Sequence, residues 1–233
     1  MTTHGVLVSA LCICAIHQAA AFTPVPPSRV HSSSSTTARF AIALPELSLL
    51  ADLFTSADAR RSQLKRQILD LASETERGLT ATDEQKRVME GLFVRLEALN
   101  PTRDPLVVGG NKKPSVNGDW SLDYTTSDSI LGKGGFARVG PIIQNIDTTT
   151  LSAKNSEVVR YGVVDVPRSV TAELSPVNGK MTDVKFKRFM LGPIGFDAPE
   201  TFRGSLDITY LDDEMRLTRG DKGNIFVLTR MPK

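Results

Sequence analysis

The sequence has few of the residues that carry most enzyme chemistry. Its 233 residues include 2 cysteines and 3 histidines, and all five lie at or before His31. Without them, the rest of the chain cannot form zinc sites of the cysteine and histidine type, histidine-dependent nucleophile pairs, dithiol redox centres or c-type haem attachment sites. The sequence therefore predicts no metal site and no catalytic residues, and a protein that is not an enzyme.

Acidic residues are missing from the first 45 positions, which have a composition of their own. Residues 6–16 form an apolar run of signal-peptide length, and Ala19, Ala20 and Ala21 provide a small-residue cleavage pattern. We therefore predict a secretory signal peptide at residues 1–21. Residues 22–42 are rich in serine and threonine and include Arg29 and Arg39, which is typical of a transit peptide.

This tandem arrangement resembles the bipartite presequences of algae whose plastids lie inside extra membranes, and it predicts a plastid protein. A secreted protein with a serine-rich linker is the alternative. Residues 1–42, the predicted leader, carry two of the 28 basic residues and none of the 26 acidic ones, so the remaining chain has no net charge. A nucleic-acid partner is not expected, because phosphate binding needs an excess or a patch of basic residues.

Apolar residues in the region 43–100 recur at helical spacing. Leu64, Ile68 and Leu71 form one such stripe, and Leu92, Leu96 and Leu99 continue another that starts at Val88. Thr82 and Gln85 form a capping box, and Asn100 with Pro101 ends the second helix. We expect helices that pack on each other or on the domain, or a hairpin that docks on a membrane or partner. Residues 101–116 contain proline, glycine and lysine and are predicted to be a linker, which would make the helices a separate appendage.

The period of the apolar residues changes to two in the region 117–233, which predicts β-strands. Asn178 with Gly179, and the turn that contains Asp221, are hairpin signals. The predicted strands are near residues 118–126, 138–147, 157–166, 169–175, 180–190, 203–211, 214–219 and 224–231. Eight short antiparallel strands favour a closed barrel, since closure removes exposed strand edges. The expected fold class is α+β, with N-terminal helices followed by an eight-stranded antiparallel barrel.

A glycine-rich segment at residues 131–139 matches the phosphate loop of protein kinases. A kinase also needs a catalytic His-Arg-Asp motif and a metal-binding Asp-Phe-Gly motif, and this sequence has neither. The glycines are therefore predicted to form a loop between strands.

Trp120, the single tryptophan, lies in the segment N-G-D-W-S-L-D-Y-T-T at residues 117–126. Alternation places Trp120, Leu122 and Tyr124 on one face of a strand. This segment resembles the plastid lipid-associated proteins, also called plastid fibrillins. The resemblance extends through G-L-T-A-T-D-E-Q-K-R-V-M-E-G-L-F and L-D-I-T-Y-L-D-D-E-M-R-L-T-R-G-D-K-G-N-I-F-V-L, and it covers roughly residues 78–230.

The resemblance implies a lipocalin-like barrel in which Gly118 and Trp120 form the G-x-W motif that plugs one end. In such barrels a basic side chain packs across the tryptophan. Arg219 shares a face with Met215 and Leu217, and Arg230 shares one with Phe226 and Leu228, so either arginine is a candidate. Trp120 is expected to act as a structural plug first and as a cavity floor second, and Asp221 is expected to have a structural role in its turn.

The resemblance further implies a plastid protein at thylakoids or plastoglobules that is associated with lipids, carotenoids or quinones. One function is a lipid- or isoprenoid-binding module, with Trp120, Tyr124, Phe186 and Phe226 as candidate lining residues. The alternative is a structural or scaffolding protein that coats lipid globules without a ligand or docks on a lipid-biosynthetic enzyme. A lipocalin-like isomerase is a third interpretation. No cofactor is expected beyond a bound lipid, carotenoid or quinone.

Overall fold

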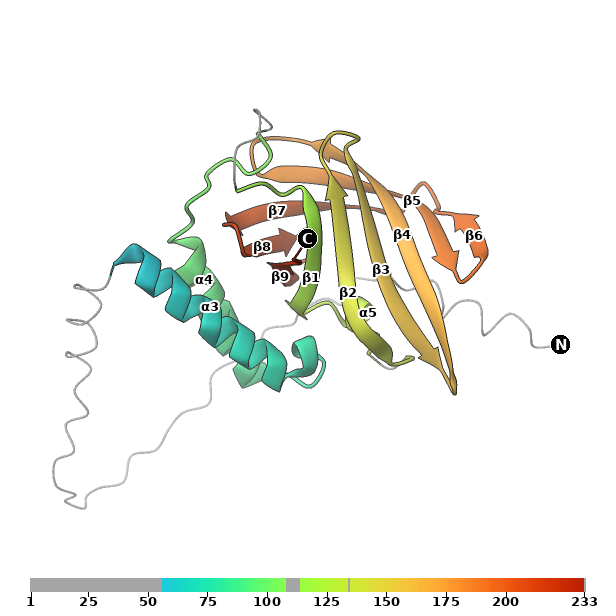
Figure 1. The fold of residues 1–233 in the computed structure, drawn as a ribbon, viewed down its shortest axis with the longest axis horizontal. Helices are drawn as coiled ribbons and strands as arrows, with labels where there is room; N and C mark the ends of the chain where they lie inside the picture. The colour runs from blue at the N-terminus through green and yellow to red at the C-terminus, as the bar shows by residue number, and fades with distance from the viewer. Residues whose placement is uncertain (1–55, 108–113, 134, 233) are drawn as a thin grey trace, which may run out of the picture.

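The computed structural model describes residues 56–107, 114–133 and 135–232. The predicted signal peptide at residues 1–21, the transit-like segment at 22–42 and the start of the helical region lie outside this part of the chain. The described residues form a β-barrel with a pair of helices packed against its outer wall (Figure 1).

The helices begin where the capping residues of the sequence place them. Helix α3 (Ala57–Glu74) follows Ser56, whose hydroxyl accepts a hydrogen bond from the amide of Ala59. A short 3-10 turn, η1 (Glu76–Gly78), leads to α4 (Asp83–Glu97). The capping box of Thr82 and Gln85 is present with both of its reciprocal hydrogen bonds, which confirms this prediction.

Nine strands follow, and eight of them close the barrel. In the described residues they are β1 (Gly118–Thr125), β2 (Arg138–Asp147), β3 (Ser152–Tyr161), β4 (Val164–Pro176), β5 (Met181–Leu191), β6 (Ile194–Asp197), β7 (Arg203–Leu211), β8 (Met215–Gly220) and β9 (Ile225–Arg230), with the short helix α5 (Asp128–Leu131) after β1. The sheet order is β4-β3-β2-β1-β9-β8-β7-β5-β6, and pairing of β4 with β5 closes the ring. Strand β6 pairs only with the second half of β5, beyond the half that pairs with β7. The eight-stranded antiparallel barrel is therefore confirmed, with β6 as an addition that the sequence did not predict.

The predicted strand boundaries at residues 157–166 and 169–175 are wrong. The chain turns at Gly162 and Val163, between β3 and β4, in the middle of the expected third strand. Gly162 has a φ of 64°, and the side chain of Val163 is 98% exposed. The hairpin tip carries apolar residues, as the strands on both sides of it do. The apolar pattern of the sequence therefore did not mark the turn.

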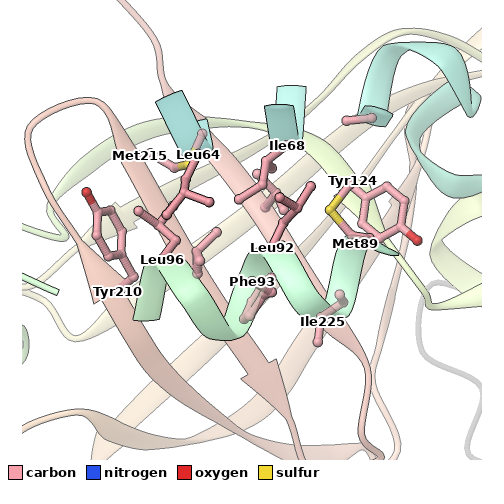
Figure 2. Close-up of a cluster of buried hydrophobic side chains, with 13 residues drawn as sticks. Leu64, Ile68, Met89, Leu92, Phe93, Leu96, Tyr124, Tyr210, Met215 and Ile225 are labelled. Atoms are coloured by element: carbon pink, nitrogen blue, oxygen red, sulfur yellow. The ribbon is translucent and has the colours of Figure 1, made fainter. Parts of the chain in front are cut away.

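Helices α3 and α4 bury one stripe of the outer barrel wall (Figure 2). Met89 and Phe93 of α4 share a single apolar cluster with Tyr124 of β1 and Ile225 of β9. The buried members of this helix–barrel cluster are Leu64, Ile68, Ala72, Met89, Leu92, Phe93, Leu96, Tyr124, Tyr210, Met215, Leu217, Ile225 and Val227. The helices therefore share a core with the barrel and are not the separate appendage that the sequence suggested.

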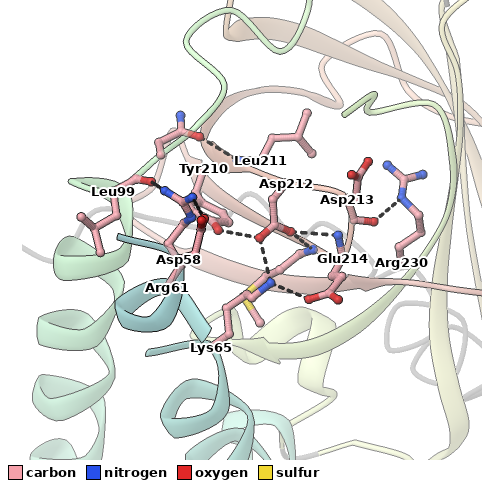
Figure 3. A network of polar contacts seen from close by, with 12 residues as sticks. Asp58, Arg61, Lys65, Leu99, Tyr210, Leu211, Asp212, Asp213, Glu214 and Arg230 are labelled. Atoms are coloured by element: carbon pink, nitrogen blue, oxygen red, sulfur yellow. Dashed lines mark hydrogen bonds and ion pairs between the residues drawn. The ribbon is translucent and has the colours of Figure 1, made fainter. Parts of the chain in front are cut away.

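Polar contacts join α3 to the turn between β7 and β8 (Figure 3). Lys65 Nζ lies 2.8 Å from Asp212 Oδ2 and 2.5 Å from Glu214 Oε2. The hydroxyl of Tyr210 donates to Asp212 Oδ2 at 2.6 Å, and the amides of Glu214 and Met215 donate to Asp212 Oδ1. Burial acts to raise the pKa of Asp212, but these hydrogen bonds outweigh it and hold the pKa below its usual value. Asp212 therefore links α3 to the β7–β8 turn as a carboxylate.

The barrel cavity as a candidate ligand site

The barrel encloses a cavity of about 520 Å³. Its wall is mainly apolar and comes from all eight closing strands. The apolar lining residues are Leu106, Val116, Leu122, Ile130, Ile142, Ile146, Leu151, Ala153, Val170, Ala172, Leu174, Pro176, Val184, Phe186, Leu206, Ile208, Phe226 and Leu228. A cavity of this size and composition falls within the range of about 300–1,000 Å³ that is typical of sites for small molecules.

Two of the four candidate lining residues border this cavity. Phe186 of β5 and Phe226 of β9 both contribute to its wall. Trp120 is completely buried and packs in the same apolar cluster as the lining residues Val116 and Leu228. Trp120 does not itself line the cavity, since its place is at the end of the barrel where β1 begins.

The fourth candidate, Tyr124, lies on the outside of the barrel, and its assignment to the lining is a correction. The pairing of β1 with β9 shifts register between Leu122 and Tyr124, at a β-bulge. A bulge adds one residue to a strand, so the residues after it point to the opposite face. Leu122 therefore faces the cavity, while Tyr124 belongs to the helix–barrel cluster.

Trp120 is held by a hydrogen bond and by a cation on its ring. Its indole N–H donates to the carbonyl of Val116 at 2.8 Å. The guanidinium of Arg230 lies over the ring, 4.1 Å from its centre. Arg230 also donates to the carbonyls of Ser115, Asn117 and Asp213. Gly118 has a φ of 115°, and its backbone lies close to the guanidinium of Arg230. A Cβ added at Gly118 would lie 3.3 Å from Arg230 Nη1.

Arg219, the other candidate for the tryptophan, points away from the cavity. It forms ion pairs with Glu90 and Glu97 of α4 at 2.7 and 2.8 Å, and its guanidinium lies 4.8 Å from the centre of the Phe93 ring. The hydrogen bonds to Glu97 and Glu90 raise the pKa of Arg219. Met215 and Leu217, which share its face, are buried by the helices and not by the cavity.

Arg216 is a site residue that the sequence analysis missed. It follows Met215 on β8, faces the cavity and is only 3% exposed. Its guanidinium lies 4.9 Å from the centre of the Trp120 ring, and one Nη donates to the side-chain oxygen of Gln144. Gln144 in turn donates to Asn155 at 3.0 Å. Burial, with the nearby charge of Arg230, lowers the pKa of Arg216 to about 9.

A second polar group lies near the opposite end of β2. Arg138 Nε is 2.7 Å from Glu157, and Arg168 Nε is 3.5 Å from the other oxygen of the same carboxylate. These side chains neutralise one another in part. The turn after β8 borders the cavity nearby, where the amide of Asp221 donates to the carbonyl of Ser205 at 3.2 Å.

The described residues contain no cluster of three or more histidine, cysteine, aspartate or glutamate side chains that could hold a metal ion. In the same part of the chain, every helix is too short or too polar to cross a bilayer.

A closed eight-stranded antiparallel barrel around an apolar cavity defines a lipocalin-like fold. The chain matches the PAP_fibrillin family model over residues 62–229, which is more than half of its length. It therefore belongs to the PAP/fibrillin family, the plastid lipid-associated proteins. No solved structure gives a significant match to it.

Individual relatives agree with this assignment. "Probable plastid-lipid-associated protein 5, chloroplastic" of Arabidopsis thaliana is 38% identical over 176 residues, which cover 74% of this chain and 70% of that protein. "Chromoplast-specific carotenoid-associated protein C1, chromoplastic" of an Oncidium hybrid cultivar is 27% identical over 241 residues, which cover 79% and 74%. "Light-induced protein, chloroplastic" of Solanum tuberosum is 26% identical over 221 residues, which cover 72% and 67%. These plastid relatives confirm the plastid localisation that the leader predicted.

Proposed function

We propose that this protein has a non-catalytic role in which the barrel cavity binds one lipid or isoprenoid molecule, such as a carotenoid or a quinone, at thylakoids or plastoglobules. The observation that carries this proposal is the apolar cavity of about 520 Å³. Filling it with an apolar molecule would remove both the ligand and the lining side chains from water, at about 25 cal/mol per Å² of buried apolar area. The name of the carotenoid-associated relative from Oncidium supports the same class of ligand.

The test is native mass spectrometry, with lipid and pigment extraction, of the protein purified from its own plastids. We expect one apolar molecule per chain. Ala172, a buried lining residue, gives a variant that blocks the cavity: Ala172→Phe should lower ligand occupancy. Ala59→Phe, on an exposed face of α3, adds the same ring outside the cavity and serves as the control. Absence of a stoichiometric ligand, or equal occupancy in both variants, would contradict cavity binding.

A second candidate function, attachment to a lipid surface without a required ligand, is favoured by the loops at the barrel end away from Trp120. Val163 and Val164 lie at the β3–β4 tip and are 98% and 56% exposed, and Ile194 after the β5–β6 turn is 65% exposed. The two hairpins are neighbours, since the amide of Gly192 donates to the carbonyl of Pro167 at 2.8 Å. Exposed apolar side chains on adjacent loops suit insertion into a lipid interface.

Flotation with vesicles of plastid lipids tests this second function. The double substitution Val163→Asp and Ile194→Asp should release the protein from the vesicles, because charged groups are costly to bury in the interface. Val177→Asp is the matched control, since Val177 is 56% exposed in the β4–β5 turn at the other end of the barrel. If the double variant floats as well as the parent protein, these hairpins do not hold the lipid surface.

A further inference from the structure

Arg216 is a buried cation without an acidic partner. Among the described residues, its guanidinium takes part in no ion pair, and its Nε has no hydrogen-bond acceptor. Two other arginines with little-exposed side chains, Arg138 and Arg168, share the carboxylate of Glu157. Among the described residues, the groups beside the Arg216 guanidinium are the neutral side chain of Gln144, the ring of Trp120 and a second cation, Arg230.

The described protein groups alone leave this charge uncompensated. Guanidinium has five N–H donors, and it stays charged near neutral pH even though burial lowers its pKa to about 9. A buried charge without a counter-ion is costly, and buried cations in folded proteins are ordinarily paired. A further unpaired donor lies two positions along on the same strand face, because the hydroxyl of Thr218 is buried, has no partner and also borders the cavity.

The group that would satisfy both side chains is an anion with two acceptor oxygens. A carboxylate matches the planar fork of a guanidinium and can form two parallel charge-assisted hydrogen bonds with it. A neutral carbonyl, as in a quinone, would accept a hydrogen bond but leave the charge uncompensated. Next to Arg216 and Thr218 the cavity wall is apolar, with Leu228 and Phe226 on β9 and Ile208 on β7. Farther along, the lining becomes polar again at Arg138 and Glu157, which pair with each other. The site thus has an unpaired cation next to Trp120, an apolar stretch beside it, and a second polar group whose charges are partly paired with each other.

We propose that the cavity binds a carboxylate-bearing lipid, a long-chain fatty acid, with its carboxylate on Arg216 and Thr218 and its chain along Ile208, Phe226 and Leu228. This inference rests on the proposed function, since it narrows the class of lipid that the cavity accepts.

The experiment measures binding of three probes to the purified, delipidated full-length chain at pH 7.5. Oleic acid carries the carboxylate, oleyl alcohol has the same chain without the charge, and decylubiquinone is a neutral quinone with an alkyl tail. We expect oleic acid to bind at least tenfold more tightly than oleyl alcohol. Arg216→Met should remove this difference while leaving the affinity for oleyl alcohol within about threefold. Arg216→Lys, which keeps the charge but loses the fork, should retain part of the preference.

Arg160→Met is the matched control, because Arg160 lies on the exposed outer wall of β3, where its ion-pair partner among the described residues is Asp165. It should bind all three probes like the parent protein. Equal binding of oleic acid and oleyl alcohol by the parent, or an acid preference that survives in Arg216→Met, would overturn the inference and leave lipid binding intact. Failure of all three probes to bind would overturn the proposed ligand-binding function as well. If Arg216→Met does not fold, the parent's acid preference and the Arg216→Lys variant decide the question.

Discussion

The guanidinium of Arg230 lies 4.1 Å from the centre of the Trp120 ring. The two residues are direct partners in the pairing of β9 with β1. The same arginine donates to carbonyls of Ser115 and Asn117 before β1 and of Asp213 in the β7–β8 turn. One cation therefore joins the start of the barrel, its last strand and a turn that also contacts α3. This end of the barrel is a local structure with many contacts, and Trp120 lies at its centre.

Trp120→Ala should destabilise the protein by about 3–5 kcal/mol, as expected when a large side chain is removed from a packed core. Trp120 is completely buried, and its loss would also leave Arg230 without the ring beneath it. A urea melt followed by circular dichroism measures the free energy of unfolding. Phe136→Ala, at an aromatic residue that is 41% exposed, should cost much less. A variant as stable as the parent protein that had lost its ligand would show that Trp120 is a cavity floor and not a plug.

Asp212→Asn should lower the free energy of unfolding by about 1–3 kcal/mol at pH 7, because the carboxylate accepts several hydrogen bonds, one of them from a lysine. The folded state holds the pKa of Asp212 below its usual value, so its contribution is present above about pH 4 and is lost as the pH falls through the lowered pKa. The difference between Asp212→Asn and the parent protein should therefore shrink below pH 4. Urea melts between pH 2.5 and 7 test this. Asp213→Asn, at the exposed neighbouring position, should show no comparable loss at pH 7.

Local patterns predicted the elements of this fold because each carries its own signal. The capping residues Thr82 and Gln85 mark the start of α4, and the turn around Asp221 marks the hairpin of β8 and β9. Alternation identified the strands but could not orient β8. Both faces of this strand are buried, one by the cavity and one by the helices, so Met215 and Leu217 looked like interior residues. Arg216 was missed for the same reason.

Features that depend on tertiary pairing were beyond the sequence. The bulge that turns Tyr124 outward has no glycine or proline to mark it, and it is visible only in the register of β1 against β9. The choice between Arg219 and Arg230 was open from the alternation alone. Helix α4 decides it, because Glu90 and Glu97 hold Arg219 on the outer wall. These two glutamates lie far from β8 in the sequence.

Gly78 and Gly91 should respond in opposite ways to alanine. Gly78 has a φ of 98°, and an added Cβ would lie 2.4 Å from the carbonyl oxygen of Thr125, so Gly78→Ala should cost about 2 kcal/mol or more. Gly91 is exposed within α4 and has no atom within 4 Å of such a Cβ, so Gly91→Ala should stabilise by about 0.5–1 kcal/mol. Thermal melts of both variants test the close contact of η1 with β1. A neutral Gly78→Ala would show that this contact can open without loss.

Removal of the helices should prevent the barrel from folding as a stable monomer. A chain that begins at Pro101 would expose the outer stripe formed by Tyr124, Met215, Leu217, Ile225 and Val227, all of which the helices now bury. A stripe of this kind on the surface favours association or a loosely packed state. Near-ultraviolet circular dichroism and analytical ultracentrifugation of the truncated and full-length proteins measure side-chain packing and association.

Arg219→Ala in the full-length chain is the milder comparison. It removes the ion pairs to Glu90 and Glu97 but keeps the apolar contacts, so it should cost only about 1–2 kcal/mol and stay monomeric. Cooperative unfolding of a monomeric truncated protein with unchanged ligand affinity would instead show that the barrel core is complete without α3 and α4.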